Sequence, residues 1–225
     1  GYYGSNNVVE ISKLGKLSVS VDTRIGNYGK NNTLTVGADG TLNSANIHLG
    51  RYGGSDNNRL IVSGANALGI ASNNLYIGFY GATNSAQVAN GGTLRSRDLR
   101  IGNFGRNNTL TIQTNGTVNC NDLSLGRYGG SDNNRLELDG SAALLFATNN
   151  ATIGYYGTGN SIELSNGGAL QVGNRLTIGY SNSLNSLTIN ANSSVNAEDL
   201  FFGYETGANS NALSVNGANA SLTVA

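Results

Sequence analysis

A glycine preceded by Ile or Leu returns at nearly constant spacing along this 225-residue chain, and this period restricts the possible folds. The series begins at Gly1, and Phe202-Gly203 continues it near the end. The spacings, counted along the sequence from Gly1, are 25, 24, 28, 24, 24, 28, 25 and 24. A repeat of 20–50 residues is typical of solenoids, propellers and repeat arrays. The intervening glycines are Gly26, Gly50, Gly78, Gly102, Gly126, Gly154 and Gly179.

Three groups of apolar residues recur within each period. Apolar side chains one and three residues before the glycine alternate as in a strand with one buried face. A second alternating pair, such as Leu34 and Val36, begins eight residues after the glycine, or ten residues after it in the longer repeats. The third group comprises single apolar residues, which we expect to point inward: Leu17, Leu42, Leu68, Leu94, Val118, Leu144, Leu170 and Val195.

Three short strands in each period predict an all-β fold, a right-handed parallel β-helix (β-solenoid). We expect about nine coils of 24–28 residues, each strand pairing with its equivalent one repeat later. Parallel crossover connections strongly favour the right-handed coil. A propeller blade needs about 40 residues and four antiparallel strands, which this spacing does not provide.

The decapeptide RYGGSDNNRL occurs at 51–60 and again at 127–136. The two copies lie at the same point of a short, long, short series of spacings. This series indicates duplication of a three-coil unit, a superrepeat of about 76 residues. The decapeptide contains the two extra residues that delay the second strand of each long coil. Residues 1–225 are predicted to form a single β-solenoid segment, part of a longer repetitive chain.

The composition excludes several partners. The chain has 13 basic and 13 acidic residues, and only 12% of its residues are charged, so it has no electrostatic reason to bind nucleic acid. No apolar run approaches the roughly 20 residues of a membrane-spanning helix. The single cysteine, Cys120, excludes an internal disulfide bond.

Asparagine is strongly enriched, and pairs of Asn recur at one corner of the repeat. Asn tolerates left-handed backbone conformations, and stacked Asn side chains can form hydrogen bonds along a column of equivalent positions. We therefore predict a structural Asn ladder made of Asn31, Asn32, Asn57, Asn58, Asn107, Asn108, Asn133 and Asn134.

The stretches LRIGNFGRNNTLTIQTNGTVNCNDLSLGRYG and IGFYGATNSAQVANGGTLRSRDLRIG resemble the short repeats of bacterial autotransporter passengers and PEP-CTERM-associated surface proteins. The shared pattern is Ile-Gly-x-x-Gly, then Asn-x-Leu-x-Val, then Gly-Gly-x-Leu, and it covers essentially the whole chain. The last two coils depart from it, because IGYSNS and FGYETG lack the second glycine. The resemblance implies an exported β-solenoid, located outside the cell or on the bacterial cell surface. It implies no catalytic residue.

An aromatic residue follows most of the periodic glycines by two positions, and Tyr180 and Tyr204 follow by one. Stacking would place these rings in a column along one corner. The column could bind glycans or a neighbouring filament, because aromatic rings provide contact surface for either partner. Alternatively, its only role could be to cover the core. This candidate aromatic surface ladder comprises Tyr3, Tyr28, Tyr52, Tyr80, Phe104, Tyr128 and Tyr156.

The charged residues provide weaker candidate sites. Asp56 and Asp132 lie in Gly-Gly-x-Asp corners that resemble calcium-binding repeats, but one carboxylate per corner is too few for an ion that takes 6–8 oxygens. We interpret each Asp as a turn cap beside a surface ion pair with Arg59 or Arg135. We expect no metal and no cofactor.

Polysaccharide cleavage would require paired carboxylates in a cleft. The candidates occupy equivalent repeat positions, and no long insertion builds a cleft around them, so we predict that the protein is not an enzyme. His48 aligns with Ser124 and Cys120 with Ser44, which indicates outward or corner positions. The carboxylate candidates are Asp98, Asp122, Glu198 and Asp199, with Arg95, Arg97 and Arg100 nearby.

The sequence therefore predicts a structural protein that forms a stalk, fibre or filament, by strand stacking and by end-to-end or lateral self-association. One alternative is an adhesin that binds a glycan or host ligand through the aromatic ladder. A second alternative, less favoured by these residues, is a polysaccharide-degrading enzyme.

Overall fold

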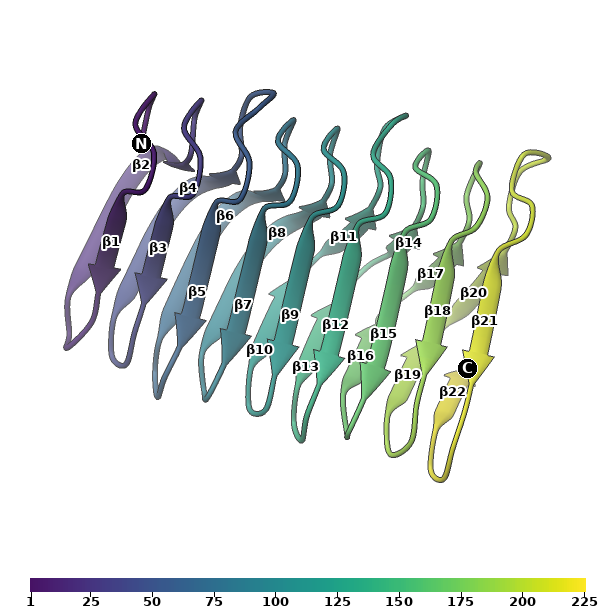
Figure 1. Cartoon of the computed structure of the whole chain (residues 1–225). Coiled ribbons are helices and arrows are strands. Elements are labelled where there is room, and N and C mark those ends of the chain that lie inside the picture. The colour runs from purple at the N-terminus through teal and green to yellow at the C-terminus, as the bar shows by residue number, and fades with distance from the viewer.

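The computed structural model, which describes residues 1–225, is a β-solenoid of about nine turns without any helix. The strands of the front sheet run downward in Figure 1, the strands behind run upward, and successive coils advance from left to right. This path makes the coil right-handed. All pairings between strands are parallel and join residues one coil apart, as in the pairing of Thr33–Val36 with Val8–Ile11.

One sheet contains one strand from each coil, and every strand pairs with the equivalent strands of the adjacent coils. Its members are β1 (Val8–Ile11), β3 (Thr33–Val36), β5 (Arg59–Ser63), β7 (Ser85–Ala89), β9 (Thr109–Gln113), β12 (Arg135–Asp139), β15 (Ser161–Ser165), β18 (Ser186–Ile189) and β21 (Ala212–Val215).

The second sheet supplies the other two faces of each coil. In the early coils one long strand runs around a corner, where its register shifts: β2 (Lys16–Ile25), β4 (Thr41–Leu49), β6 (Leu68–Ile77) and β8 (Thr93–Ile101). In the later coils the corner separates two strands, and the chain closes with β22 (Ser221–Val224). The separated pairs are β10 (Thr117–Cys120) and β11 (Asp122–Leu125), β13 (Leu144–Ala147) and β14 (Ala151–Ile153), β16 (Ala169–Val172) and β17 (Arg175–Ile178), and β19 (Ser194–Ala197) and β20 (Asp199–Phe202).

The core is one continuous apolar column along the solenoid axis. A single cluster of 41 buried residues extends from Ile11 to Ala197. The residues that directly precede the periodic glycines, such as Ile77, Ile101 and Leu125, are fully buried. Burying an aliphatic side chain stabilises the fold by about 1.5–3 kcal/mol, so each coil adds a similar increment of stability.

The third apolar group is partly misassigned by the sequence pattern. Leu68 and Leu144 pair with Thr41 and Thr117, and all four lie half-buried on the outer side of the sheet. The core position in each long coil is one residue later, at Gly69 and Leu145. The cause is an additional residue before β6 and before β13, which a fixed count from the glycine does not register. Because a one-residue slip reverses the face of a strand, the count places these outward leucines inward.

An uninterrupted Asn ladder runs the length of the solenoid beside β1 and its equivalents. In the middle of the ladder, the backbone N–H and the side-chain Nδ2 of Asn84 both donate to Oδ1 of Asn108, at 2.9 and 3.3 Å. Asn108 bonds in the same way to Asn134, at 2.9 and 3.0 Å. Each coil contributes one member: Asn7, Asn32, Asn58, Asn84, Asn108, Asn134, Asn160, Asn185 and Asn211.

The structure divides the predicted Asn ladder into two kinds of position. Asn32, Asn58, Asn108 and Asn134 are buried ladder members. Their neighbours lie outside the ladder and adopt left-handed backbone conformations, with φ between 54° and 56°: Asn31, Asn57, Asn107 and Asn133. The remaining ladder members could have been found from sequence, because each stands six or eight residues after its periodic glycine.

The ladder also explains the periodic glycines. Gly102 has φ of +70°, which L-residues with a side chain adopt with strain. A Cβ at Gly102 would also overlap the side chain of Asn134 in the next coil. The same overlap joins Gly78 to Asn108, so glycine and asparagine positions are coupled from one coil to the next.

The long coils carry wider loops between the periodic glycine and the strand that follows it, at the upper edge of Figure 1. Their extra residues are Gly53 and Gly54, and Gly129 and Gly130 in the second copy of the decapeptide. A Cβ at any of these four glycines would meet no atom within 4 Å. Their loops therefore extend away from the packed coil.

Replacing Asn108 by Ala should lower the free energy of unfolding by about 2–4 kcal/mol, because the backbone N–H and the Nδ2 of Asn84 lose their buried acceptor. Urea denaturation followed by circular dichroism measures this change. The matched control is Asn107→Gly, which removes an adjacent exposed Asn and keeps the left-handed backbone accessible. Equal destabilisation by both variants would contradict a structural role for the ladder.

Candidate functional site

The aromatic residues at the corner form three separate stacks. Tyr28 lies 4.5 Å from Tyr52 between ring centroids, and Phe104 lies 4.4 Å from Tyr128, with near-parallel rings. No ring contact joins Tyr52 to Tyr80 or Tyr128 to Tyr156. The predicted single column is therefore interrupted after each long coil. The three stacks are Tyr3, Tyr28 and Tyr52; Tyr80, Phe104 and Tyr128; and Tyr155, Tyr180 and Tyr204.

The breaks follow from backbone register. The N–H of Tyr52 donates to Asn27, whereas the N–H of Tyr80 donates to Gly50, which aligns Tyr80 with Arg51 rather than with Tyr52. The wider loop of the long coil causes this slip. In the last stack Tyr155 takes the place that sequence counting assigns to Tyr156, and Tyr156 meets Tyr155 edge-on.

The stacked rings expose mainly their edges. The exposed fractions of Tyr80 and Tyr128 are 47% and 37%, although each ring has a partner on one face. Hydrogen bonding with Tyr155 raises the pKa of Tyr180 to about 12, and burial adds to the shift. Two arginines lie against the stacks, since the guanidinium groups of Arg51 and Arg127 are 5.5 Å from the ring centroids of Tyr52 and Tyr128. The corner therefore presents partly exposed tyrosine rings with two cationic groups beside them.

The aspartates of the decapeptide accept hydrogen bonds from the backbone of the next coil. The Oδ1 of Asp56 accepts from the N–H of Ala82 at 2.9 Å, and Asp132 does the same for Thr158 at 2.8 Å. They therefore cap turns as expected, but they do not pair with the expected arginines. Arg135 binds Glu163 and Glu137, and Arg59 donates to Gln87.

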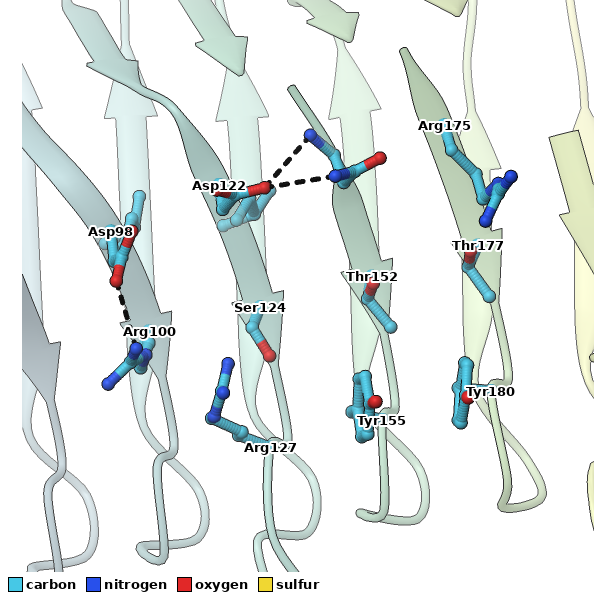
Figure 2. A pocket seen from close by; sticks show the side chains of 13 residues that line it. Asp98, Arg100, Asp122, Ser124, Arg127, Thr152, Tyr155, Arg175, Thr177 and Tyr180 are labelled. Atoms are coloured by element: carbon cyan, nitrogen blue, oxygen red, sulfur yellow. Dashed lines mark hydrogen bonds and ion pairs between the residues drawn. The ribbon is translucent and has the colours of Figure 1, made fainter. Parts of the chain in front are cut away.

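A groove of about 390 Å³ lies over β11, β14 and β17. Its floor carries the hydroxyl side chains of Ser124, Thr152 and Thr177, which lie in one row across the three strands (Figure 2). Arg127, Tyr155 and Tyr180 line one side of the row, and Asp122 and Arg175 line the other side. Asn150, which is hydrogen-bonded to Asp122, also lines the groove. Asp98 and Arg100 complete the wall toward the N-terminus.

Of the carboxylates considered for catalysis, the groove brings together Asp98 and Asp122, which occupy paired positions on adjacent strands. Asp98 binds Arg100 at 3.0 Å, and Asp122 accepts from the backbone N–H and Nδ2 of Asn150, each at 3.3 Å. Glu198 and Asp199 are exposed and do not line the groove. Arg95 and Arg97 also lie outside it.

The groove lies mainly on the second three-coil unit, residues 102–178. On the first unit, residues 26–101, the equivalent surface is filled by aromatic side chains. His48 stacks on Tyr76 with ring centroids 4.8 Å apart, and Phe79 meets both rings edge-on. Asp22 binds Arg24 at 2.7 Å and Arg51 at 2.8 Å beside them. The positions equivalent to His48, Tyr76 and Phe79 in the second three-coil unit are Ser124, Thr152 and Tyr155.

His48 and Asp22 both have shifted pKa values. Burial lowers the pKa of His48 to about 4, although the nearby Asp22 opposes the shift. Burial by itself raises the pKa of Asp22, but hydrogen bonds from Arg24, Asn46 and Arg51 outweigh it and lower the pKa to about 2. At neutral pH the pair is therefore a neutral imidazole beside a carboxylate.

Alignment of the sister coils predicts outward or corner positions for His48 and Cys120, and the structure corrects the second assignment. Cys120 belongs to the apolar core, where burial raises the pKa of its thiol to about 12. His48 points outward from its strand but is 7% exposed, because Tyr76 and Phe79 cover it. No group of three or more His, Cys, Asp or Glu side chains could hold a metal ion. No helix is available to cross a membrane.

Comparisons of this chain with protein-family models, with curated proteins and with solved structures found no match.

Lowering the pH from 6.5 to 4 should destabilise the protein through His48. In this window His48 binds a proton in the unfolded state but not in the folded state. The free energy of unfolding therefore decreases as the pH is lowered, by up to about 3 kcal/mol. His48→Ser, which copies the residue of the sister coil, should remove this part of the pH dependence. Urea denaturation of both proteins at pH 7 and pH 4.5 tests the prediction. Parallel pH profiles for the two proteins would show that His48 is not the titrating group.

Proposed function

We propose that this protein is a structural, non-enzymatic rod that acts outside the cell or on the bacterial cell surface. The observation that carries the proposal is the unbroken axial hydrogen bonding, in which the Asn ladder and the parallel strands link every coil to the next. Nine coils at roughly 4.8 Å each make a rod about 43 Å long. A solenoid of this kind separates its two ends by a fixed distance.

Two further features support a mechanical role in an exported protein. The resemblance to autotransporter passengers and PEP-CTERM-associated proteins extends over nearly all coils, and it rests on structural residues. The charge balance is neutral, and the polar surface consists largely of Asn, Ser and Thr. Such a surface remains hydrated without attracting polyanions.

We also propose that the rods associate, end to end or laterally, through strand edges. An unpaired strand edge presents backbone N–H and C=O groups to which a strand of another copy can add. Sedimentation that is independent of protein concentration up to the millimolar range would contradict self-association.

Single-molecule pulling on the two ends of the chain tests the mechanical role. The rod should resist extension and then lengthen in steps of one coil or a small number of coils, roughly 80 Å for each coil of about 25 residues. The Asn108→Ala variant should rupture at lower force, and Asn107→Gly should match the unmodified protein. Smooth extension at low force, without steps, would contradict a mechanical role.

An adhesin is a second candidate, favoured by the exposed ring edges and hydroxyl groups of the aromatic stacks. Tyr rings supply both apolar and hydrogen-bonding contacts to sugars. Replacing Tyr52, Tyr80 and Tyr128 together by Ala should abolish retention on immobilised glycans, while the rod remains folded. Retention that is unaffected by the triple substitution would exclude this surface as the binding site.

A further inference from the structure

We propose that the groove over β11, β14 and β17 binds a carboxylated sugar, a uronic acid or sialic acid unit of a glycan. The groove lies on the strand face, and Tyr155 and Tyr180 of the last corner stack line one side of it. The inference goes beyond the rod function and does not depend on it. Arg127 would bind the sugar carboxylate, and the hydroxyl floor and Asp122 would bind the sugar hydroxyl groups.

The duplicated sequence supplies the strongest support for a site. The two three-coil units share their frame, and they differ where this groove lies. The first unit fills the space with the packed rings of His48, Tyr76 and Phe79. The second unit has Ser124 and Thr152 in place of the first two rings, which leaves a concave surface of about 390 Å³.

The two units also differ in the partners of one equivalent arginine, Arg51 in the first unit and Arg127 in the second. Arg51 is neutralised by Asp22, at 2.8 Å. Its counterpart Arg127 makes no ion pair. Asp98, the counterpart of Asp22, pairs with Arg100, which corresponds to Arg24, and with Arg97. The Nε of Arg127 is buried and has no hydrogen-bond partner. An arginine without a carboxylate partner, at the edge of a concave surface, is suited to bind a ligand carboxylate through two parallel hydrogen bonds.

The other residues that line the groove provide hydrogen-bonding groups and an aromatic face, which are the contacts that a sugar needs. Ser124 is more than nine-tenths buried, and its Oγ has no partner in the protein. Asp122 has no cationic partner and can accept hydrogen bonds from hydroxyl groups. Tyr155 begins the last aromatic stack, so the ring face that looks toward Arg127 is not covered by another ring (Figure 2). A sugar ring can lie against such a face.

The dimensions and charge narrow the ligand class. The floor crosses three strands, roughly 10 Å from the first to the third, a length that takes two or three sugar units. The lining has three Arg and two Asp side chains, so the carboxylates would repel a dense polyanion such as nucleic acid. A glycan with one carboxylate among several hydroxyl groups fits both the unpaired Arg127 and the hydroxyl floor.

Isothermal titration calorimetry at low ionic strength tests the proposal on the full 225-residue chain. The probes are a galacturonic acid trisaccharide, a hyaluronan tetrasaccharide and sialyllactose, and the control ligand is the methyl ester of the first. At least one acidic probe should bind, and the ester should bind about tenfold more weakly or not at all. Absence of binding by all three acidic probes, or equal binding by the ester, would overturn the proposal.

Two variants place the binding at this groove. Arg127→Gln should weaken binding about tenfold or more, whereas the matched Arg51→Gln should leave it unchanged. The double variant Ser124→His with Thr152→Tyr rebuilds the packing of the first unit and should abolish binding. Its circular dichroism spectrum and melting temperature should stay near those of the unmodified protein, because the same rings already pack on the same frame.

These results separate the groove from the other proposed surfaces. Binding that survives in the double variant, or that falls equally in Arg51→Gln and Arg127→Gln, would overturn the assignment of the ligand to this groove. Loss of binding in Arg127→Gln with unchanged stepwise unfolding under force would support the groove and leave the rod function intact.

Discussion

The hydrogen bonds that run parallel to the solenoid axis determine most of the structure. From Asn32 to Asn185, each ladder Asn uses one oxygen to accept both the backbone and the side-chain donor of the preceding coil, so equivalent positions must lie directly above one another. The ladder side chain occupies the space that a Cβ on the periodic glycine of the preceding coil would need. The sequence period is thus the outcome of coupled requirements on two residues in neighbouring coils, together with the apolar column that they enclose.

Because the ladder and the core fix the frame, outward side chains can change without altering it. The two three-coil units show this separation. One carries a packed aromatic cluster with a paired Asp22 and Arg51, and the other carries a hydroxyl-lined groove with an unpaired Arg127. Differences of this kind disturb the fold little, since strand pairing uses backbone atoms and inward side chains only. A solenoid can therefore acquire a binding surface on one stretch while its neighbours remain purely structural.

The fold could be predicted from the sequence because its determinants repeat. Gly102 and its equivalents mark the coils, and alternating apolar pairs mark the strands. The single-residue insertions at corners occur in the long coils and not in the short ones, which is why a count common to all coils assigns Leu68 and Leu144 to the wrong face. The breaks in the aromatic column have the same origin, since the loop of each long coil shifts Tyr80 onto Arg51. The groove could not be predicted, because it depends on the small size of Ser124 and Thr152 relative to side chains on adjacent strands.

The glycine-rich loops of the long coils have a further consequence. Gly53 and Gly129 begin outward extensions whose Cβ positions would meet no other atom, and the frame beneath them is held by the coils on either side. Both loops lie on the same edge of the molecule, three coils and roughly 14 Å apart. A foreign peptide inserted into each loop would be displayed in two copies at a fixed separation and orientation. The solenoid could therefore present paired epitopes at a defined spacing to receptors that respond to such pairs.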